Sequence, residues 1–179
     1  MPVSAPDEVA TAVSATDVVQ VLARKGRAAD LAAAMRSSFA LELPAAGHAT
    51  TSGNVTALWI QPDGFFLLAP SGPEGALARS VKAACGDAAS VIDQTHGRSV
   101  VTLSGIRAAW VLAKFCRVDL HPSAFGPGSV ASTQIAHLAC TIHQRDAAPS
   151  YDLIVFTTFR KSFLESLTHA AEDTGAVTA

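Results

Sequence analysis

Residues 93–116 read DQTHGRSVVTLSGIRAAWVLAKFC, and this stretch decides the fold because it restarts a pattern already present near the N-terminus. The β-branched run 98–104 predicts a strand, and the alanine-rich run 105–116 predicts a helix. Residues 17–24 and 27–39 show the same order, a strand followed by a helix. The chain is therefore predicted to contain two copies of one unit.

Further segments follow in the same order in both copies. In the first copy they are a loop at 48–54 (HATTSGN), strands at 55–61 and 65–69, a helix at 73–85 and a strand at 89–92. In the second copy they are one long strand or a bent pair of strands at 129–144, a strand at 151–157 and a helix at 159–173. Local identities support the repeat: Arg27 and Ala28 match Arg107 and Ala108, while Phe65 aligns with Tyr151.

The repeated order β-α-β-β-α predicts an α+β fold made of two ferredoxin-like halves, each with an antiparallel sheet and helices on one face. One domain is expected over residues 17–173, with halves at about 17–93 and 94–173. Residues 1–16 are expected to form a disordered or extended tail, and residues 174–179 a second tail. An unrelated α+β arrangement is the alternative.

Composition excludes several classes of protein. The chain has 179 residues, of which 49% are hydrophobic and 16% charged, and its formal net charge is -2. This balance argues against nucleic acid or anionic lipid as a partner, and the low charge content favours a surface that is buried against another protein. Neither a secretory signal nor a run of about 20 apolar residues is present. The sequence therefore predicts an intracellular, cytoplasmic protein.

Three groups of polar residues resemble parts of an active site. Asp93, His96 and Arg98 precede the strand that opens the second copy, but an Arg paired with a carboxylate is the commoner arrangement. The Ser104-Gly105 pair precedes a helix, where its amides could hold an anion or where Ser104 could act as a simple N-cap.

Asp119 and His121 form the third group. They could make a dyad, although an aspartate in a loop more often accepts hydrogen bonds from neighbouring amides.

Metal-ligating residues are also too few for a site. His137 and His143 have matching parity on a regular strand, with Cys140 on the opposite face, and zinc requires three or four convergent ligands. Cys85, Cys116 and Cys140 lack any CxxC spacing and are predicted to be reduced, buried thiols. The sequence therefore predicts no catalytic, cofactor-binding or metal-binding residue in this chain.

Several longer motifs carry a family resemblance. DQTHGRSVVTLSG, VLAKFCRVDLHPSAFGPGS, STQIAHLACTIHQ and YDLIVFTTFRKSFLESL occur in this order, after ALWIQPDGFFLLAPSGPEGAL. From about residue 17 to residue 172 the chain resembles the gamma subunits of heterotetrameric sarcosine oxidases. It departs from them at Thr157-Thr158-Phe159, where a basic residue is usual.

The resemblance implies a fold like the folate-binding module of aminomethyltransferases. It also implies a role in a complex that demethylates sarcosine to glycine, forms hydrogen peroxide and passes the one-carbon unit to tetrahydrofolate. FAD, FMN and NAD would then belong to the alpha and beta subunits and zinc to the delta subunit, while this chain would pack mainly on alpha without a cofactor. The alternatives are a gamma-type subunit of a related N-methyl amino acid dehydrogenase, a free-standing folate-binding aminomethyltransferase-like protein, and a small-molecule regulatory module.

Overall fold

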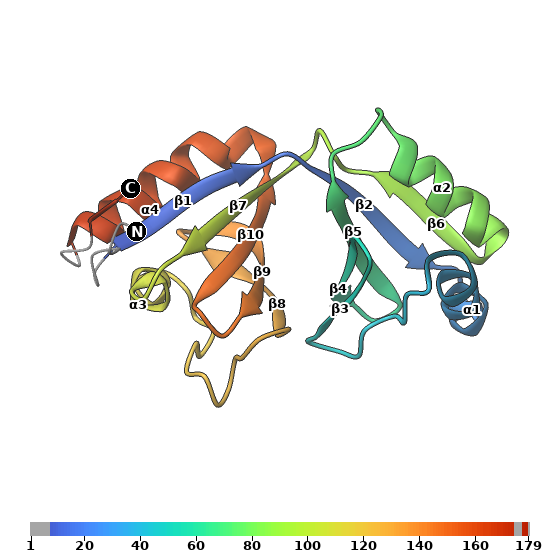
Figure 1. Cartoon of the computed structure of the whole chain (residues 1–179), viewed down its shortest axis with the longest axis horizontal. Helices are drawn as coiled ribbons and strands as arrows, with labels where there is room; N and C mark the ends of the chain where they lie inside the picture. The colour runs from blue at the N-terminus through green and yellow to red at the C-terminus, as the bar shows by residue number, and fades with distance from the viewer. Residues whose placement is uncertain (1–7, 174–176, 179) are drawn as a thin grey trace. The chain divides into compact units, whose positions relative to one another are not determined.

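The computed structural model describes residues 8–173 and 177–178. The chain divides into two compact units, which Figure 1 shows with their helices and strands labelled. One unit, here called the middle unit, is the continuous segment Ala15–Arg98. The other, the terminal unit, combines Met1–Ser14 with Ser99–Ala179. Both ends of the chain therefore contribute to one and the same unit.

The middle unit is a five-stranded antiparallel sheet with two helices. Its elements are β2 (Thr16–Ala23), α1 (Ala28–Phe39), β3 (Ala49–Ser52), β4 (Val55–Gln61), β5 (Gly64–Pro70), α2 (Ala76–Cys85), a 3-10 turn (Gly86–Ala88) and β6 (Ala89–Asp93). The strands lie in the order β3-β4-β5-β2-β6. Each predicted helix and strand of this unit is present, and the differences lie at the ends of elements and in the loop before β4.

The core of the middle unit forms between the helices and one face of the sheet. Leu31 and Met35 are fully buried one helical turn apart on α1, as the spacing predicts, and Val81 is buried on α2. These side chains pack in the same cluster as Val19 of β2 and Leu67 of β5. Apolar residues at helical spacing and at strand spacing thus meet across one interface.

The segment after α1 corrects one prediction. Residues 48–54 are predicted to form a loop, but Ala49–Ser52 form β3, which pairs with β4. The polar side chains suggest a loop because β3 lies at the edge of the sheet, where side chains are only partly buried and can be polar. Thr51 and Thr56 lie opposite one another, with their hydroxyl oxygens 3.0 Å apart.

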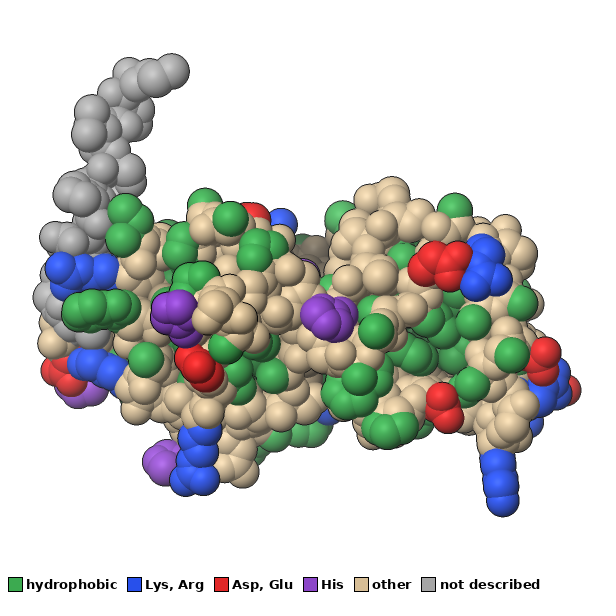
Figure 2. All heavy atoms as spheres, turned by 90° about the horizontal axis from the view of Figure 1, so that it is seen from below, with side chains coloured by type: hydrophobic (Ala, Val, Ile, Leu, Met, Phe, Trp, Pro, Cys, Tyr) green, Lys and Arg blue, Asp and Glu red, His purple; other side chains and the backbone are tan. Residues whose placement is uncertain are grey.

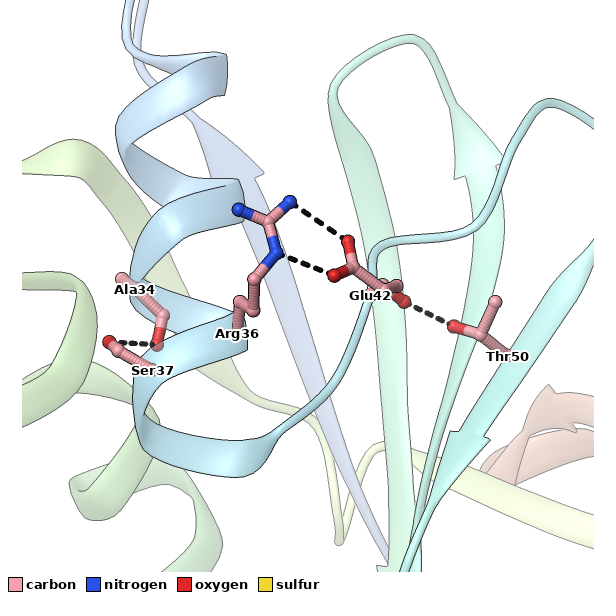
Figure 3. Close-up of polar contacts among 5 residues, drawn as sticks. All are labelled: Ala34, Arg36, Ser37, Glu42 and Thr50. Carbon is pink, nitrogen blue, oxygen red and sulfur yellow. Dashed lines mark hydrogen bonds and ion pairs between the residues drawn. The ribbon is translucent and has the colours of Figure 1, made fainter.

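Glu42 links the end of α1 to β3 (Figure 3). The guanidinium of Arg36 donates two hydrogen bonds to the Glu42 carboxylate, and the Thr50 hydroxyl donates to the Glu42 carbonyl oxygen. The hydrogen bond from Arg36 lowers the pKa of Glu42. Since both charged groups face solvent, the pair fixes the direction of the loop more than it stabilises the fold.

The terminal unit is a six-stranded sheet that also carries two helices. Its elements are β1 (Glu8–Ser14), β7 (Arg98–Ser104), α3 (Ala108–Ala113), β8 (Val130–Ile135), β9 (Leu138–Asp146), β10 (Ser150–Phe156), a 3-10 turn (Thr157–Phe159), α4 (Arg160–Asp173) and β11 (Val177–Thr178). The strands lie in the order β11-β1-β7-β10-β9-β8. The segment predicted as one long strand or a bent pair is the β8–β9 hairpin, with Ala136 and His137 at positive φ in its turn.

The ends of the chain differ from the predicted tails. Residues 8–14 form β1, which pairs antiparallel with β7 from Ala10 opposite Ser104 to Ser14 opposite Val100. Val9 is fully buried in the core of the terminal unit. Residues 177–178 form β11 beside β1, whereas residues 1–7, 174–176 and 179 of the predicted tails lie outside the described residues.

Both sheets share a strand order. In the middle unit β5 lies between β4 and β2, with β6 beyond β2; in the terminal unit β10 lies between β9 and β7, with β1 beyond β7. The N-terminal strand β1 therefore takes in one unit the place that β6 takes in the other. Arg27 and Arg107, aligned by sequence, are each the residue before a helix, and Phe65 and Tyr151 lie in β5 and β10.

The core of the terminal unit is built chiefly from α4, α3 and the sheet. Phe163 and Leu167 of α4 and Val111 of α3 are buried with Leu153 and Val155 of β10. None of the helices in the described part of the chain has the length and apolar character needed to cross a membrane.

Candidate functional site

The turn after β6 holds two of the predicted polar residues. The backbone N–H of Thr95 donates to the Asp93 carboxylate at 2.9 Å. This bond is the main cause of a lowered pKa for Asp93, and the charges of His96 and Arg79 act in the same direction. His96 Nε2 lies 3.8 Å from a carboxylate oxygen of Glu74, with both side chains largely exposed. These contacts order a surface turn.

Arg98 has a different neighbour. Its guanidinium carbon lies 5.4 Å from the ring centroid of Phe66, within the range of a cation–π contact. Asp93 binds the amide of its own turn, and the charge of Arg79 helps to lower its pKa. That Arg98 pairs with a carboxylate stays a prediction.

The predicted N-cap at Ser104 is wrong. Ser104 is the last residue of β7 and lies opposite Ala10, while α3 begins at Ala108 with Arg107 as its N-cap residue. The N–H of Gly105, proposed as part of an anion site, donates to the carbonyl oxygen of Pro149 at 3.1 Å. That amide is satisfied by the protein itself.

Asp119 and His121 follow the simpler interpretation of the sequence. The backbone N–H of His121 donates to the Asp119 carboxylate at 2.9 Å, and the imidazole Nδ1 lies 2.7 Å from the Ser123 hydroxyl. The carboxylate thus contacts the amide of residue 121 and not its ring. The prediction that these residues satisfy loop groups is confirmed.

The three candidate metal ligands lie in different environments. His137 occupies the turn between β8 and β9 at φ 65°, so the parity argument that treats it as a strand residue is wrong. Cys140 belongs to the hydrophobic core, and His143 is buried beside Asp152. Within residues 8–173 and 177–178, no group of three His, Cys, Asp or Glu side chains could hold a metal ion.

The cysteines behave as predicted. Cys85, Cys116 and Cys140 are free thiols, and all three are buried. Burial raises the pKa of the Cys85 and Cys116 thiols. Since the thiolate is the reactive form, these two groups are poor nucleophiles in the folded protein.

A polar cluster around the mostly buried side chains of Asp152 and His143 on the terminal sheet was not predicted. Thr102 of β7 donates to the Asp152 carboxylate at 2.8 Å, and the Thr102 and Ser14 hydroxyls lie 3.5 Å apart. His143 Nδ1 and Arg145 Nε each lie 3.7 Å from the other Asp152 oxygen. The side chain of Asp152 is only 13% exposed and that of His143 only 10%. This cluster connects β1, β7, β9 and β10.

One signal in the sequence could have revealed it. Asp152 interrupts the apolar run 151–156, and His143 and Arg145 alternate with other residues on the preceding strand. A charged residue inside an apolar strand needs a partner on the same face. The register, which places Asp152 opposite His143, supplies that partner.

Large apolar side chains reach the surface at α3. Ile106 is 69% exposed and Trp110 is 68% exposed. The guanidinium carbon of Arg107 lies 5.8 Å from the centroid of the Trp110 ring. On the face drawn in Figure 2, charged side chains are scattered, and exposed hydrophobic side chains lie among the charged ones.

Comparisons with known proteins agree with the motifs. The model of the "Sarcosine oxidase, gamma subunit family" matches residues 25–173. The gamma subunit of sarcosine oxidase from Corynebacterium sp. (strain P-1) is 39% identical over 113 residues, 63% of this chain and 52% of that protein. The gamma subunit from Corynebacterium sp. (strain U-96) is 35% identical over 140 residues, 76% of this chain and 65% of that protein. These matches span about half to two thirds of the relatives' length.

Solved structures show the same relationship. A chain of the heterotetrameric sarcosine oxidase from Corynebacterium sp. U-96, in complex with pyrrole 2-carboxylate, matches with a TM-score of 0.84 and 29% identity, covering 99% of this chain and 90% of that one. The glycine cleavage system aminomethyltransferase T from Bartonella henselae matches with a TM-score of 0.67 over 89% of this chain and 45% of that one. Its 17% identity shows a shared fold alone. By motif, family model and structure, the chain belongs to the sarcosine oxidase gamma subunit family.

Proposed function

We propose that this chain is a non-catalytic gamma subunit of a heterotetrameric sarcosine oxidase. The observation that carries the proposal is the match of 99% of the chain to a subunit of such an enzyme, at 29% identity. In this proposal the complex demethylates sarcosine oxidatively to glycine, reduces oxygen to hydrogen peroxide and transfers the one-carbon unit to tetrahydrofolate. The alpha, beta and delta subunits hold FAD, FMN, NAD and zinc and bind tetrahydrofolate, and alpha is the main contact of this chain.

The contacts of the carboxylates support a structural role. Asp93 binds the amide of Thr95, and Asp119 binds the amide of His121. Asp152 accepts from Thr102. Each carboxylate therefore already has a partner within the chain, whereas a general base must reach a proton of a bound substrate.

The strand orders support the remaining part of the fold prediction. The order β4-β5-β2-β6, combined with the chain order β2-α1-β4-β5-α2-β6, is that of a split βαβ, ferredoxin-like half. The terminal unit has the order β9-β10-β7-β1. We propose that both units are ferredoxin-like halves of an aminomethyltransferase-type fold, the second completed by β1.

Co-expression tests the functional proposal. The chain is produced with a tagged alpha subunit and with beta and delta subunits, and the purified assembly is assayed for hydrogen peroxide formed from sarcosine. We expect this chain in equal amount with alpha, and no sarcosine-dependent peroxide from the chain alone. Peroxide made by the isolated chain would contradict the non-catalytic assignment.

Two further measurements separate the alternatives. Calorimetry of the isolated chain with tetrahydrofolate should give no saturable heat, and micromolar binding would favour the free-standing folate-binding protein. Assays of the assembly with sarcosine and with larger N-methyl amino acids, using oxygen and then a dye as electron acceptor, identify the substrate. A preference for a larger substrate and for the dye would favour the dehydrogenase alternative.

A further inference from the structure

A hollow in the terminal unit lies between the end of α3 and the tip of the β8–β9 hairpin. Its volume is about 380 Å³, which is in the range of pockets that hold small molecules. The polar residues that line it are Lys114, Arg117, Gln134 and His137. No Asp or Glu of the described chain is among the lining residues. The hollow, here called the basic hollow, therefore favours a negatively charged ligand.

Two of its basic side chains are not neutralised by an acidic neighbour. Lys114 Nζ lies 3.3 Å from a carboxylate oxygen of Asp173, so its charge is already balanced. Arg117 and His137 are exposed, and their side chains make no hydrogen bond or ion pair with another residue that the structure describes. Asp119, two residues after Arg117, accepts from a backbone amide of its own loop. The basic hollow thus carries the permanent charge of Arg117 and a second charge when His137 is protonated.

The turn that carries His137 has a strained backbone. Ala136 has a φ of 49° and His137 a φ of 65°, and the paired residues Ile135 and Leu138 flank them. Two-residue hairpin turns with positive φ at both positions usually contain Asn-Gly or Asp-Gly, since a Cβ disfavours this conformation. Strained residues of this kind cluster at ligand-binding sites, where the strain holds a side chain in position. In this turn the strained residues place an imidazole at the basic hollow, which Asn-Gly would lack.

We propose that the basic hollow binds the phosphate group of a small phosphate monoester. The planar guanidinium of Arg117 suits this group, because it can donate two parallel hydrogen bonds to two phosphate oxygens. His137 and the amide of Gln134 supply further donors. The two positive charges match a phosphate monoester, which carries a charge of about -1.5 to -2 near pH 7, better than they match a single carboxylate. Phe115, half-buried in the wall, offers an apolar surface to the organic part of the ligand.

Titration of the isotope-labelled, full-length chain with phenyl phosphate, followed by NMR, tests the proposal. The amide signals of residues 113–117 and 134–137 should shift and saturate at millimolar ligand, and inorganic phosphate should shift the same signals. Benzoate, which has a similar ring but a single charge, should bind at least about tenfold more weakly. Benzyl alcohol, which has no charge, should not shift these signals. Equal affinity for benzoate, or shifts confined to other residues, would overturn the proposal.

Two arginine substitutions separate a specific site from a general effect of charge. Arg117→Gln should weaken the binding of phenyl phosphate by at least about tenfold, because it removes a charge-assisted, two-pronged contact. The matched control is Arg160→Gln, which makes the same change at an exposed residue of α4 that does not line the hollow and should leave the affinity unchanged. Equal losses in the two variants would show that net charge, and not this hollow, determines the binding.

The double variant Ala136→Asn/His137→Gly tests the strained turn. Its melting temperature should rise by about 2–4 °C, because Asn-Gly suits the positive φ values, while its affinity for phenyl phosphate should fall. A turn with only a structural role would gain stability and lose no affinity, and that result would overturn the proposal. The inference goes beyond the proposed function and does not depend on it. These titrations use the chain alone and the co-expression assay uses the complex, so each can fail without the other.

Discussion

Replacing Val9 with alanine tests whether the N-terminal segment is a true strand of the terminal unit. Val9 is fully buried in that unit's core, although it lies in a segment expected from the sequence to be a tail. The substitution removes two carbons, and each buried methylene contributes about 0.8 kcal/mol, or about 1.6 kcal/mol together. A residual cavity raises the expected loss of unfolding free energy to about 2 kcal/mol.

Urea unfolding followed by circular dichroism measures this loss. With a denaturant slope of about 2–3 kcal/mol/M, the midpoint should fall by roughly 0.7–1 M. Val13→Ala is the matched control, because Val13 lies on the same strand but is 45% exposed, and its midpoint should change by less than about 0.2 M. Equal effects of the two substitutions, or no effect of Val9→Ala, would refute the placement of β1 in the core.

Three further outcomes are expected. Asp152→Ala should lower the free energy of unfolding by about 2–3 kcal/mol, because it leaves the buried side chain of His143 without the carboxylate beside it. Asp87→Ala removes one partner of an exposed ion pair and should cost less than about 0.5 kcal/mol in the same urea titration. Because the pKa of Asp93 is lower in the folded than in the unfolded protein, its ionised form stabilises the fold above the unfolded pKa of about 4. This stabilisation is lost as the pH falls through the folded pKa. The free energy of unfolding should therefore decline less between pH 5 and pH 3 in Asp93→Asn than in the wild-type chain. Cys85 and Cys116 should react with a disulfide reagent at pH 8 at least about 100-fold more slowly in the native protein than in denaturant, since the thiols are buried with raised pKa values.

Elements with local signals were predictable from the sequence. The helical spacing of Leu31 and Met35 is a property of a few consecutive residues. The strand β1 has no such signal, because its partner β7 lies far along the chain and its side chains mix apolar and polar types. Pairing across that distance decides its structure, and composition alone cannot reveal the pairing.

The same distinction holds for the polar residues. Asp119 accepts from the amide of His121, two residues on, so local chemistry predicts its role. Asp152 meets Thr102, which is fifty positions away in the sequence, and this contact depends on the order of β7 and β10 in the sheet. At Ser104 a local signal gave a wrong prediction. Serine is suited to capping a helix, but Ser104 is the last residue of β7, and α3 begins only at Ala108.

The three carboxylates described above and the tryptophan of α3 differ in how the fold places them. Asp93, Asp119 and Asp152 each accept a hydrogen bond from a group within the same unit, so these carboxylates stabilise turns and strands. The tryptophan on α3 shows the reverse, because it remains mostly exposed although the terminal unit has a core in which apolar side chains are buried. A side chain of this size gains most when another surface removes it from water.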